Sequence, residues 1–295
     1  VCLNTGCIPS KTWLQSAKIY AHALNGAVYG IKAEGLGFDQ QRVNVRKNKV
    51  VKVLAAGVKN LLQKHKVTLV AAEGKLQGLD GTGFKVKAAE EYYFGTNLLI
   101  ATGSVPLLPP ISGLANALRA GIVLTNEEIF ALQQIPASFV VIGAGAIGLE
   151  MAAYFNAVGS KVIVIEQQDR IGGEIDPEIA AILMDNYRKK GVDFRLNASV
   201  AAVDGQAVKF SSAEGEEEVT AEKVLLSVGR RPLLSGCGLE TINLAVEKGR
   251  LQVDHSGRTS VPGVYAAGDV NGRSMLAHTA YREAEVCVNQ ILGKA

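Results

Sequence analysis

The stretch Phe139-Val140-Val141-Ile142-Gly143-Ala144-Gly145-Ala146-Ile147-Gly148-Leu149-Glu150 decides how this chain folds. It opens with an apolar run typical of a buried strand, turns through glycines spaced G-x-G-x-x-G, and continues as a helical segment to about Val158. A second apolar run, Val162–Ile165, follows as the next strand and ends at Glu166. The order strand, glycine turn, helix, strand predicts a βαβ unit of an α/β fold with a parallel sheet.

Each glycine of this turn has a physical reason. Gly143 makes the tight turn, Gly145 lets the backbone approach a pyrophosphate, and Gly148 lets the helix pack closely on the strand. The pyrophosphate would then lie beside Ala146, at the positive N-terminal end of the helix. We therefore predict a dinucleotide site here. The alternative is a glycine-rich turn that serves packing alone.

The acid at the end of the second strand selects the dinucleotide. The carboxylate of Glu166 can accept hydrogen bonds from ribose hydroxyls and would repel a 2′-phosphate. This residue favours NAD over NADP.

The rest of the chain alternates helical and strand patterns around a proline-rich linker at residues 105–110. One helix is signalled at both ends, because Asp176 stands at its N-cap, Pro177 at its first position and Gly191 just past its end. One further helix is expected after Lys11 to about residue 24, and others at 45–64 and 276–292. The other expected strands are 67–71, 84–87, 98–101 and 263–267, and the unit that begins at Phe139 is expected to close near residues 224–230.

Composition excludes several classes of protein. Hydrophobic residues make up 48% of the chain and charged residues 20%, which excludes a disordered chain. The apolar runs are far shorter than the roughly 20 residues of a membrane span, so no membrane association is predicted. A net charge of +3 is too small to indicate a nucleic-acid partner. Since no signal peptide is visible, the predicted location is the cytoplasm.

Cys2 and Cys7 form a C-x-x-x-x-C pair. Zinc sites more often use C-x-x-C pairs, and no second pair or nearby histidine completes four ligands, so no metal site is predicted. A structural disulfide over so short a loop would remove little chain entropy. A redox dithiol fits better, because a helix start and nearby Lys11 both favour the thiolate. On these residues alone the redox role stays open.

Four segments of the chain form a recognisable set: Cys2 to Lys11, Ala101-Thr102-Gly103-Ser104, Gly143 to Glu150, and Gly263 to Asp269. Together they resemble the pyridine nucleotide-disulfide oxidoreductases, a family of flavoproteins. Within this family, the segment Met275-Leu276-Ala277-His278 resembles the dihydrolipoamide dehydrogenase branch most.

The resemblance implies two dinucleotide-binding, Rossmann-like domains. The FAD domain would be discontinuous around an inserted NAD domain, with boundaries at 1–114 for the first FAD part, 115–232 for the NAD domain and 233–295 for the returning FAD segment. The FAD domain would also be incomplete, because family members begin with their own FAD fingerprint and end with a dimerisation domain. The chain is therefore expected to be a central fragment of a homodimeric protein.

The resemblance also assigns roles to residues. Cys2 would exchange with a dithiol substrate, Cys7 would lie against the flavin, and Lys11 would lie near the flavin, paired with Glu150. Asp269 would accept from the ribityl chain. The other residues that the resemblance places at FAD are Gly74, Thr102, Gly103, Ser104, Gly268, Met275, Leu276, Ala277 and His278, and those at the nicotinamide nucleotide are Ile147, Val200, Gly229 and Arg230.

The expected reaction oxidises dihydrolipoamide, or another small dithiol, through a Cys2–Cys7 disulfide and FAD to NAD. Mercuric or glutathione reduction is the alternative within the family, and a non-catalytic NAD-binding fragment is the alternative outside it. None of the four histidines stands before the Glu-Pro pattern of the family's acid/base histidine. The isolated chain is therefore expected to purify colourless, bind NADH and turn over lipoamide negligibly.

Overall fold

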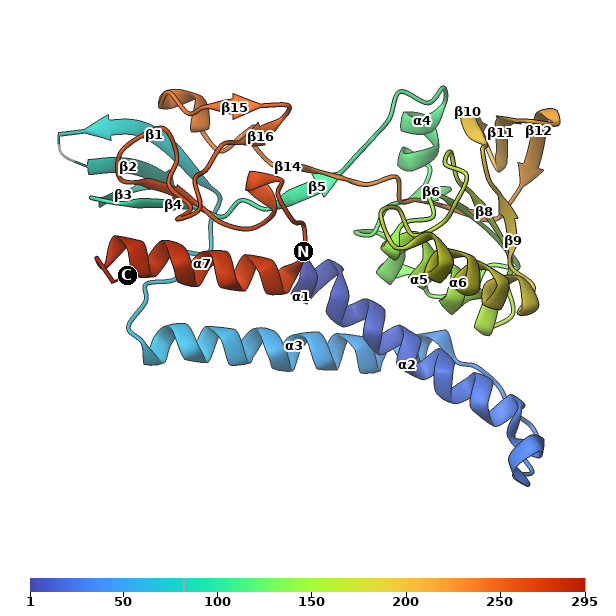
Figure 1. The fold of residues 1–295 in the computed structure, drawn as a ribbon. Helices are drawn as coiled ribbons and strands as arrows, with labels where there is room; N and C mark the ends of the chain where they lie inside the picture. The colour runs from blue at the N-terminus through green and yellow to red at the C-terminus, as the bar shows by residue number, and fades with distance from the viewer. Residues whose placement is uncertain (82, 295) are drawn as a thin grey trace. The chain divides into compact units, whose positions relative to one another are not determined.

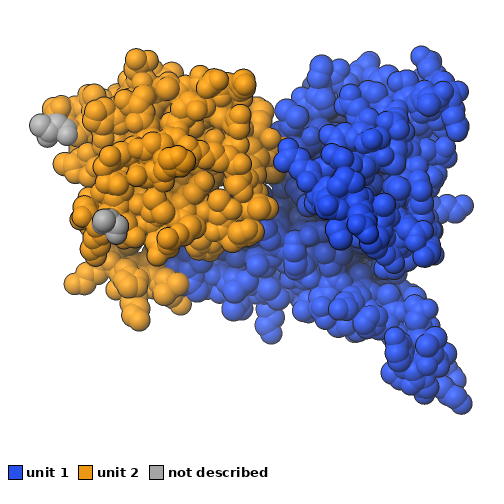
Figure 2. All heavy atoms as spheres, in the orientation of Figure 1, with its two compact units in different colours: residues 1–59, 106–229 blue, residues 60–105, 230–295 orange. Residues whose placement is uncertain are grey.

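The computed structural model describes residues 1–81 and 83–294. The chain forms two compact units, coloured separately in Figure 2. Unit 1 comprises Val1–Lys59 and Pro106–Gly229, and unit 2 comprises Asn60–Val105 and Arg230–Ala295. Each unit is therefore assembled from two separate stretches of chain.

Unit 1 is built on a five-stranded sheet in which every pair of neighbouring strands is parallel. Ile142 stands opposite both Leu226 and Ile165, so three strands end at one edge of the sheet. This sheet confirms the predicted α/β fold. The strands, in spatial order, are β6 (Val123–Leu124), β13 (Lys223–Leu226), β7 (Ser138–Ile142), β8 (Lys161–Ile165) and β9 (Asp193–Arg195).

Alternate residues of β7 serve the two faces of this sheet. Phe139 and Val141 belong to a core shared with helices α2 (Cys7–Leu24), α5 (Ala146–Ala157) and α6 (Pro177–Lys189). Val140 and Ile142 belong to a second core, formed with α4 and an antiparallel sheet. Those elements, visible in Figure 1, are α4 (Leu114–Arg119), β10 (Ser199–Asp204), β11 (Ala207–Ser212) and β12 (Gly215–Thr220).

Aromatic stacking and a buried polar network hold α2 in unit 1. The Trp13 ring stacks on Tyr154 of α5 at 4.6 Å between centroids, and both side chains are fully buried. The Trp13 indole donates to Asn44 of α3 (Gln40–Lys64) at 3.1 Å. The ammonium of buried Lys47, on the same helix, donates to the Phe130 carbonyl at 2.5 Å.

Unit 2 pairs β4 (Leu98–Ile100) with β17 (Val264–Ala266) in parallel. Helix α7 (Ala277–Ile291) packs on β17 through Tyr265 and buried Cys287. An antiparallel sheet, β1 (Gly74–Asp80), β2 (Gly83–Ala88) and β3 (Glu91–Gly95), contributes Leu76 and Phe84 to the other core. The short elements of the chain are α1 (Cys2–Thr5), η1 (Gly26–Tyr29), β5 (Ser104–Pro106), η2 (Ile129–Ala131), β14 (Arg230–Pro232), η3 (Leu239–Thr241), β15 (Val246–Glu247), β16 (Arg250–Leu251) and η4 (Asp269–Asn271).

The predicted capping of α6 is confirmed. Asp176 Oδ1 accepts from the amides of Glu178 (2.9 Å) and Ile179 (3.3 Å), and Gly191 past the end has a φ of +92°. The strand predicted at 67–71 is wrong, because those residues have no regular structure. Val67 and Leu69 are at least half exposed, and an apolar run forms a strand only where a partner strand completes its hydrogen bonds.

Helix α3 begins at Gln40, five residues before the predicted start. Gln40 and Asn44 are buried polar residues that belong to the network around Trp13, so the apolar pattern does not reveal this first turn. The boundaries predicted from cofactor binding are 114/115 and 232/233, whereas the compact units divide at 59/60, 105/106 and 229/230. They stay predictions, since compactness and cofactor contact are different properties. No helix in the described part of the chain is long and apolar enough to cross a membrane.

Candidate functional site

The glycine loop, residues 143–148, follows β7 and leads into α5. Gly143 has a φ of +99°, and a Cβ there would stand 2.7 Å from the Ser227 carbonyl oxygen. A Cβ on Gly148 would collide with the Gly143 carbonyl oxygen. Nothing lies within 4 Å of a Cβ built on Gly145. Two glycines are therefore required by close packing, and the third faces an open space where a phosphate can approach.

Glu166 is fixed against this loop. Its Oε2 accepts from the Ala144 amide at 2.6 Å, and its Oε1 accepts from the Gln168 amide at 2.9 Å. A carboxylate oxygen can accept more than one hydrogen bond, so each oxygen of Glu166 can still accept one from a ribose hydroxyl. The first amides of α5, including those of Ala146 and Ile147, have no partner within the helix. This arrangement fits a dinucleotide, with the pyrophosphate at the helix N-terminus.

The thiol segment, residues 2–11, belongs to the same unit. Cys2 lies in α1, Cys7 begins α2, and both thiols are free and half-buried. Burial and a hydrogen bond with the Cys7 thiol raise the pKa of Cys2. The prediction that the surroundings favour a thiolate is therefore wrong for Cys2, because burial and the second thiol act against its charge.

The predicted pair of Lys11 and Glu150 is present, with Nζ and Oε1 at 2.6 Å. The lysine side chain is 61% exposed. An exposed ion pair of this kind contributes about 0–1 kcal/mol to stability. Its effect is to join α2, which carries Cys7, to α5, which carries the glycine loop.

In unit 2, Ser104 connects two of the residues predicted to bind FAD or the nicotinamide nucleotide. Its buried hydroxyl donates to Asp269 Oδ2 at 2.5 Å and accepts from Arg230 Nε at 2.8 Å. Arg230 Nη2 also donates to the Ser104 carbonyl at 2.6 Å. Asp269 thus has one oxygen oriented by Ser104, which leaves the other oxygen to accept from a ligand hydroxyl.

Glu283 of α7 holds the turn that contains Asp269. Its Oε2 accepts from the Gly268 amide at 2.6 Å and from Asn271 Nδ2 at 2.8 Å. Sequence reasoning missed Glu283, because it stands far along the next helix and belongs to no local motif. It also missed Ser227, whose hydroxyl donates to the Gly143 carbonyl at 2.9 Å.

The remaining predicted residues are spread over several elements, and their ligand contacts stay predictions. Thr102 donates its hydroxyl proton to the Leu233 carbonyl at 2.7 Å. Val200 is half-buried in β10, and Gly229 has a φ of +125° after β13. Gly103 has a φ of +75°, and Gly74 opens β1. The residues at the start of α7 are Met275, Leu276, Ala277 and His278, of which Leu276 and His278 are exposed.

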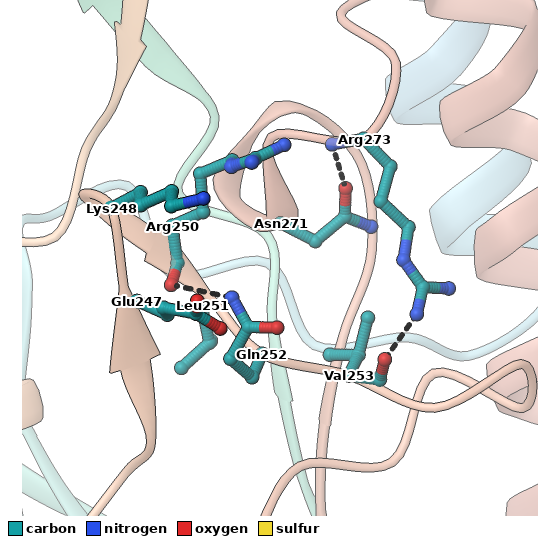
Figure 3. A pocket seen from close by; sticks show the side chains of 8 residues that line it. All are labelled: Glu247, Lys248, Arg250, Leu251, Gln252, Val253, Asn271 and Arg273. Carbon is teal, nitrogen blue, oxygen red and sulfur yellow. Dashed lines mark hydrogen bonds between the residues drawn. The ribbon is translucent and has the colours of Figure 1, made fainter.

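A polar pocket of about 180 Å³ lies in unit 2 (Figure 3). It contains none of the predicted site residues, although Asn271 and Arg273 follow Asp269 closely. Its arginines already donate to main-chain carbonyls, Arg250 to Gly272 at 3.2 Å and Arg273 to Asp254 at 3.0 Å. The lining residues are Glu247, Lys248, Arg250, Leu251, Gln252, Val253, Asn271 and Arg273. Its charged side chains are all exposed, which is typical of a solvated surface.

Comparisons with known proteins agree on one family. Residues 1–284 match the family described as pyridine nucleotide-disulphide oxidoreductase. A dihydrolipoyl dehydrogenase from Acholeplasma laidlawii is 37% identical over 298 residues, covering 99% of this chain and 85% of the relative. One from Mycoplasma genitalium is 33% identical over 296 residues, covering 100% and 64%.

Among solved structures, LpdA from Mycobacterium tuberculosis superposes with a TM-score of 0.88 at 25% identity, covering 100% of this chain and 64% of that one. The chain thus spans less than two thirds of the Mycoplasma relative and of LpdA.

Proposed function

Because the chain belongs to the pyridine nucleotide-disulphide oxidoreductase family, we propose that it acts in a flavin- and NAD-dependent disulfide oxidoreductase whose substrate is dihydrolipoamide. The observation that carries this proposal is the pair of free thiols, Cys2 and Cys7, in the same compact unit as the glycine loop. The relatives named dihydrolipoyl dehydrogenase support the substrate. The protein that contains this chain would act as a homodimer in the cytoplasm.

The two cysteines would perform the thiol chemistry. A thiolate of dihydrolipoamide attacks the sulfur of Cys2 in a Cys2–Cys7 disulfide, and the Cys7 thiolate leaves. The second substrate thiolate then attacks the mixed disulfide, which releases lipoamide and leaves both cysteines reduced. Two electrons and two protons have moved from the substrate to the cysteine pair.

The family's cofactors are FAD and NAD. In unit 2, Ser104 and Asp269 would hold the ribityl chain of FAD. In unit 1, the glycine loop would hold the NAD pyrophosphate, and Glu166 would accept from the adenosine ribose. When bound, these groups supply the route by which the electron pair leaves the cysteines. The chain's own residues supply the binding, the orientation and the thiols.

The thiol chemistry can be tested on the chain itself, without a cofactor. Mild oxidation should join Cys2 to Cys7, and stoichiometric dihydrolipoamide should reduce that bond, as read by differential alkylation and peptide mapping. Cys237→Ser should behave as the wild type, whereas Cys7→Ser should abolish the disulfide. A disulfide between Cys237 and Cys287, with Cys2 and Cys7 free, would contradict the proposal.

A second measurement separates catalysis from mere nucleotide binding. Calorimetry with NADH should show binding, and FAD with dihydrolipoamide and NAD should give negligible turnover by the 295-residue chain. The chain spans 64% of the Mycoplasma relative and of LpdA, which favours the binding-only outcome for this chain. Stoichiometric flavin absorbance together with rapid NAD reduction would show that the chain is catalytic by itself.

A further inference from the structure

The Gly143–Ala144 segment is held at each of its main-chain polar groups. From β8 and the residue after it, the Ile165 carbonyl accepts from the Gly143 amide at 2.8 Å, and Glu166 accepts from the Ala144 amide at 2.6 Å. The Gly172 amide donates to the Ala144 carbonyl at 2.9 Å. The remaining group, the Gly143 carbonyl, accepts a hydrogen bond from the Ser227 hydroxyl at 2.9 Å.

Ser227 reaches this carbonyl from the opposite neighbour of β7. It follows Leu226, which stands opposite Ile142 in the parallel pair of β13 and β7. Its amide donates to the Ile142 carbonyl at 2.8 Å, which fixes the residue at the carboxyl end of both strands. Its hydroxyl is then shared between the carbonyls of Ile142, at 3.1 Å, and Gly143.

The space around the hydroxyl suits serine. A Cβ built on Gly148 would stand 2.7 Å from Ser227 Oγ and would collide with the Gly143 carbonyl oxygen. The serine hydroxyl and that carbonyl therefore lie directly against the first turn of α5. A larger side chain at position 227 would press on the helix, and alanine would leave the carbonyl without this donor.

We infer that Ser227 is a positioning residue of the nucleotide site: its hydroxyl fixes the Gly143 peptide so that the N-terminus of α5 faces a pyrophosphate before any ligand arrives. The inference rests on the proposed binding of NAD. A loop already ordered in the free protein removes an entropic cost from binding. Without the hydroxyl, the Gly143 peptide is held only at its Ala144 amide, by Glu166, and the ligand must complete its ordering.

The test compares Ser227→Ala with a matched control, Ser138→Ala. Ser138 stands at the opposite end of the same two strands, where its Oγ accepts from the Glu222 amide at 3.0 Å. Each variant thus loses a serine hydroxyl that is hydrogen-bonded to the main chain: Ser227 donates to the carbonyls of Ile142 and Gly143, and Ser138 accepts from the Glu222 amide. Only Ser227 lies beside the glycine loop.

Calorimetry would use NADH, ADP-ribose and adenosine. Ser227→Ala should weaken NADH and ADP-ribose, which carry the pyrophosphate, by about fivefold, the factor for one ordinary hydrogen bond. Adenosine affinity should not change, and Ser138→Ala should bind all three as the wild type does. Equal affinity of Ser227→Ala and wild type for ADP-ribose would overturn the inference, as would an equal loss for adenosine.

Amide hydrogen exchange of the free protein gives a second readout. Residues 143–148 should exchange faster in Ser227→Ala than in wild type or Ser138→Ala, and unchanged exchange would overturn the inference. A wild type that binds neither NADH nor ADP-ribose would instead overturn the proposed function. The two failures are therefore distinguishable.

Discussion

The glycine loop and the thiol segment lie in the same compact unit but are built in opposite ways. The loop is fixed through its main chain, because Ile165, Glu166, Gly172 and Ser227 bind the main-chain groups of the first two residues after β7. In the thiol segment, Cys2 and Cys7 are half-buried and Lys11 is exposed. Among the ion pairs of the described residues, Lys11 pairs only with Glu150. The binding surface is therefore set by packing, whereas the reactivity of the thiols depends on a few nearby groups.

The largest effect should come from adding one methyl group inside the loop. Gly148→Ala places a Cβ against the Gly143 carbonyl, so the variant should lose about 3 kcal/mol of unfolding free energy and its affinity for NADH. Gly145→Ala is the matched control, since its Cβ meets nothing within 4 Å. It should unfold within about 0.5 kcal/mol of wild type, yet bind NADH at least tenfold (~1.4 kcal/mol) more weakly. Denaturant titration measures the unfolding free energy, and calorimetry measures the affinity for NADH. Equal stabilities of the two variants would show that the loop is not closely packed.

The next effect concerns the carboxylate that holds the loop. The wild type should bind NADH at least tenfold, or ~1.4 kcal/mol, more tightly than NADPH, because Glu166 would repel a 2′-phosphate. Glu166→Gln should reduce the ratio of NADH affinity to NADPH affinity, while it keeps a side-chain oxygen that accepts from the Ala144 amide. Glu174→Gln, on an exposed residue, is a control for net charge. Equal affinity of the wild type for both cofactors would remove the case for NAD.

A smaller effect is expected at Lys47 of α3, which lies beside Trp13 of α2. Burial lowers the pKa of Lys47, whose ammonium lies 5.8 Å from the centroids of the Trp13 and Phe130 rings. Because the folded pKa is below the unfolded one, the unfolded chain binds more protons between these two values, and stability rises with pH in that window. At pH 7 the unfolding free energy of Lys47→Met should be within about 1 kcal/mol of the wild-type value, because the substitution removes a buried charge and a hydrogen bond together.

Between pH 7 and 10, the unfolding free energy of the wild type should then rise relative to that of Lys47→Met. Exposed Lys49→Met is the control and should show no such trend. A difference that stays constant with pH would mean that burial does not perturb Lys47.

The smallest effect concerns the titration of one thiol. Since the Cys7 thiol contributes to the raised pKa of Cys2, Cys7→Ala should lower that pKa, although burial of Cys2 remains. The pH profile of Cys2 alkylation measures the change, with Cys237→Ala as the control. An unchanged profile in Cys7→Ala would assign the raised pKa to burial alone.

Local patterns were sufficient to predict the elements of the candidate nucleotide site. The apolar run, the three glycines and the following helix predicted β7, the loop and α5 close to their observed limits, and Asp176 predicted the start of α6. The run at 67–71 shows where such patterns fail, because a strand needs a partner that periodicity cannot supply. The buried first turn of α3 was missed for a related reason. Gln40 is polar, and it accepts a hydrogen bond from Tyr154, which is far away in the sequence.

The sequence by itself determined which residues are proposed to carry the chemistry: the two cysteines, the glycine fingerprint and the acid after β8. It could do so because backbone conformation and helix or strand periodicity depend on near neighbours in the chain. Only the tertiary structure decided what surrounds them: that Lys11 is exposed, that burial raises the pKa of Cys2, and that Ser227 and Glu283 hold the two loops. Burial, pKa and hydrogen-bond partners depend on groups far along the chain, which folding alone brings into contact.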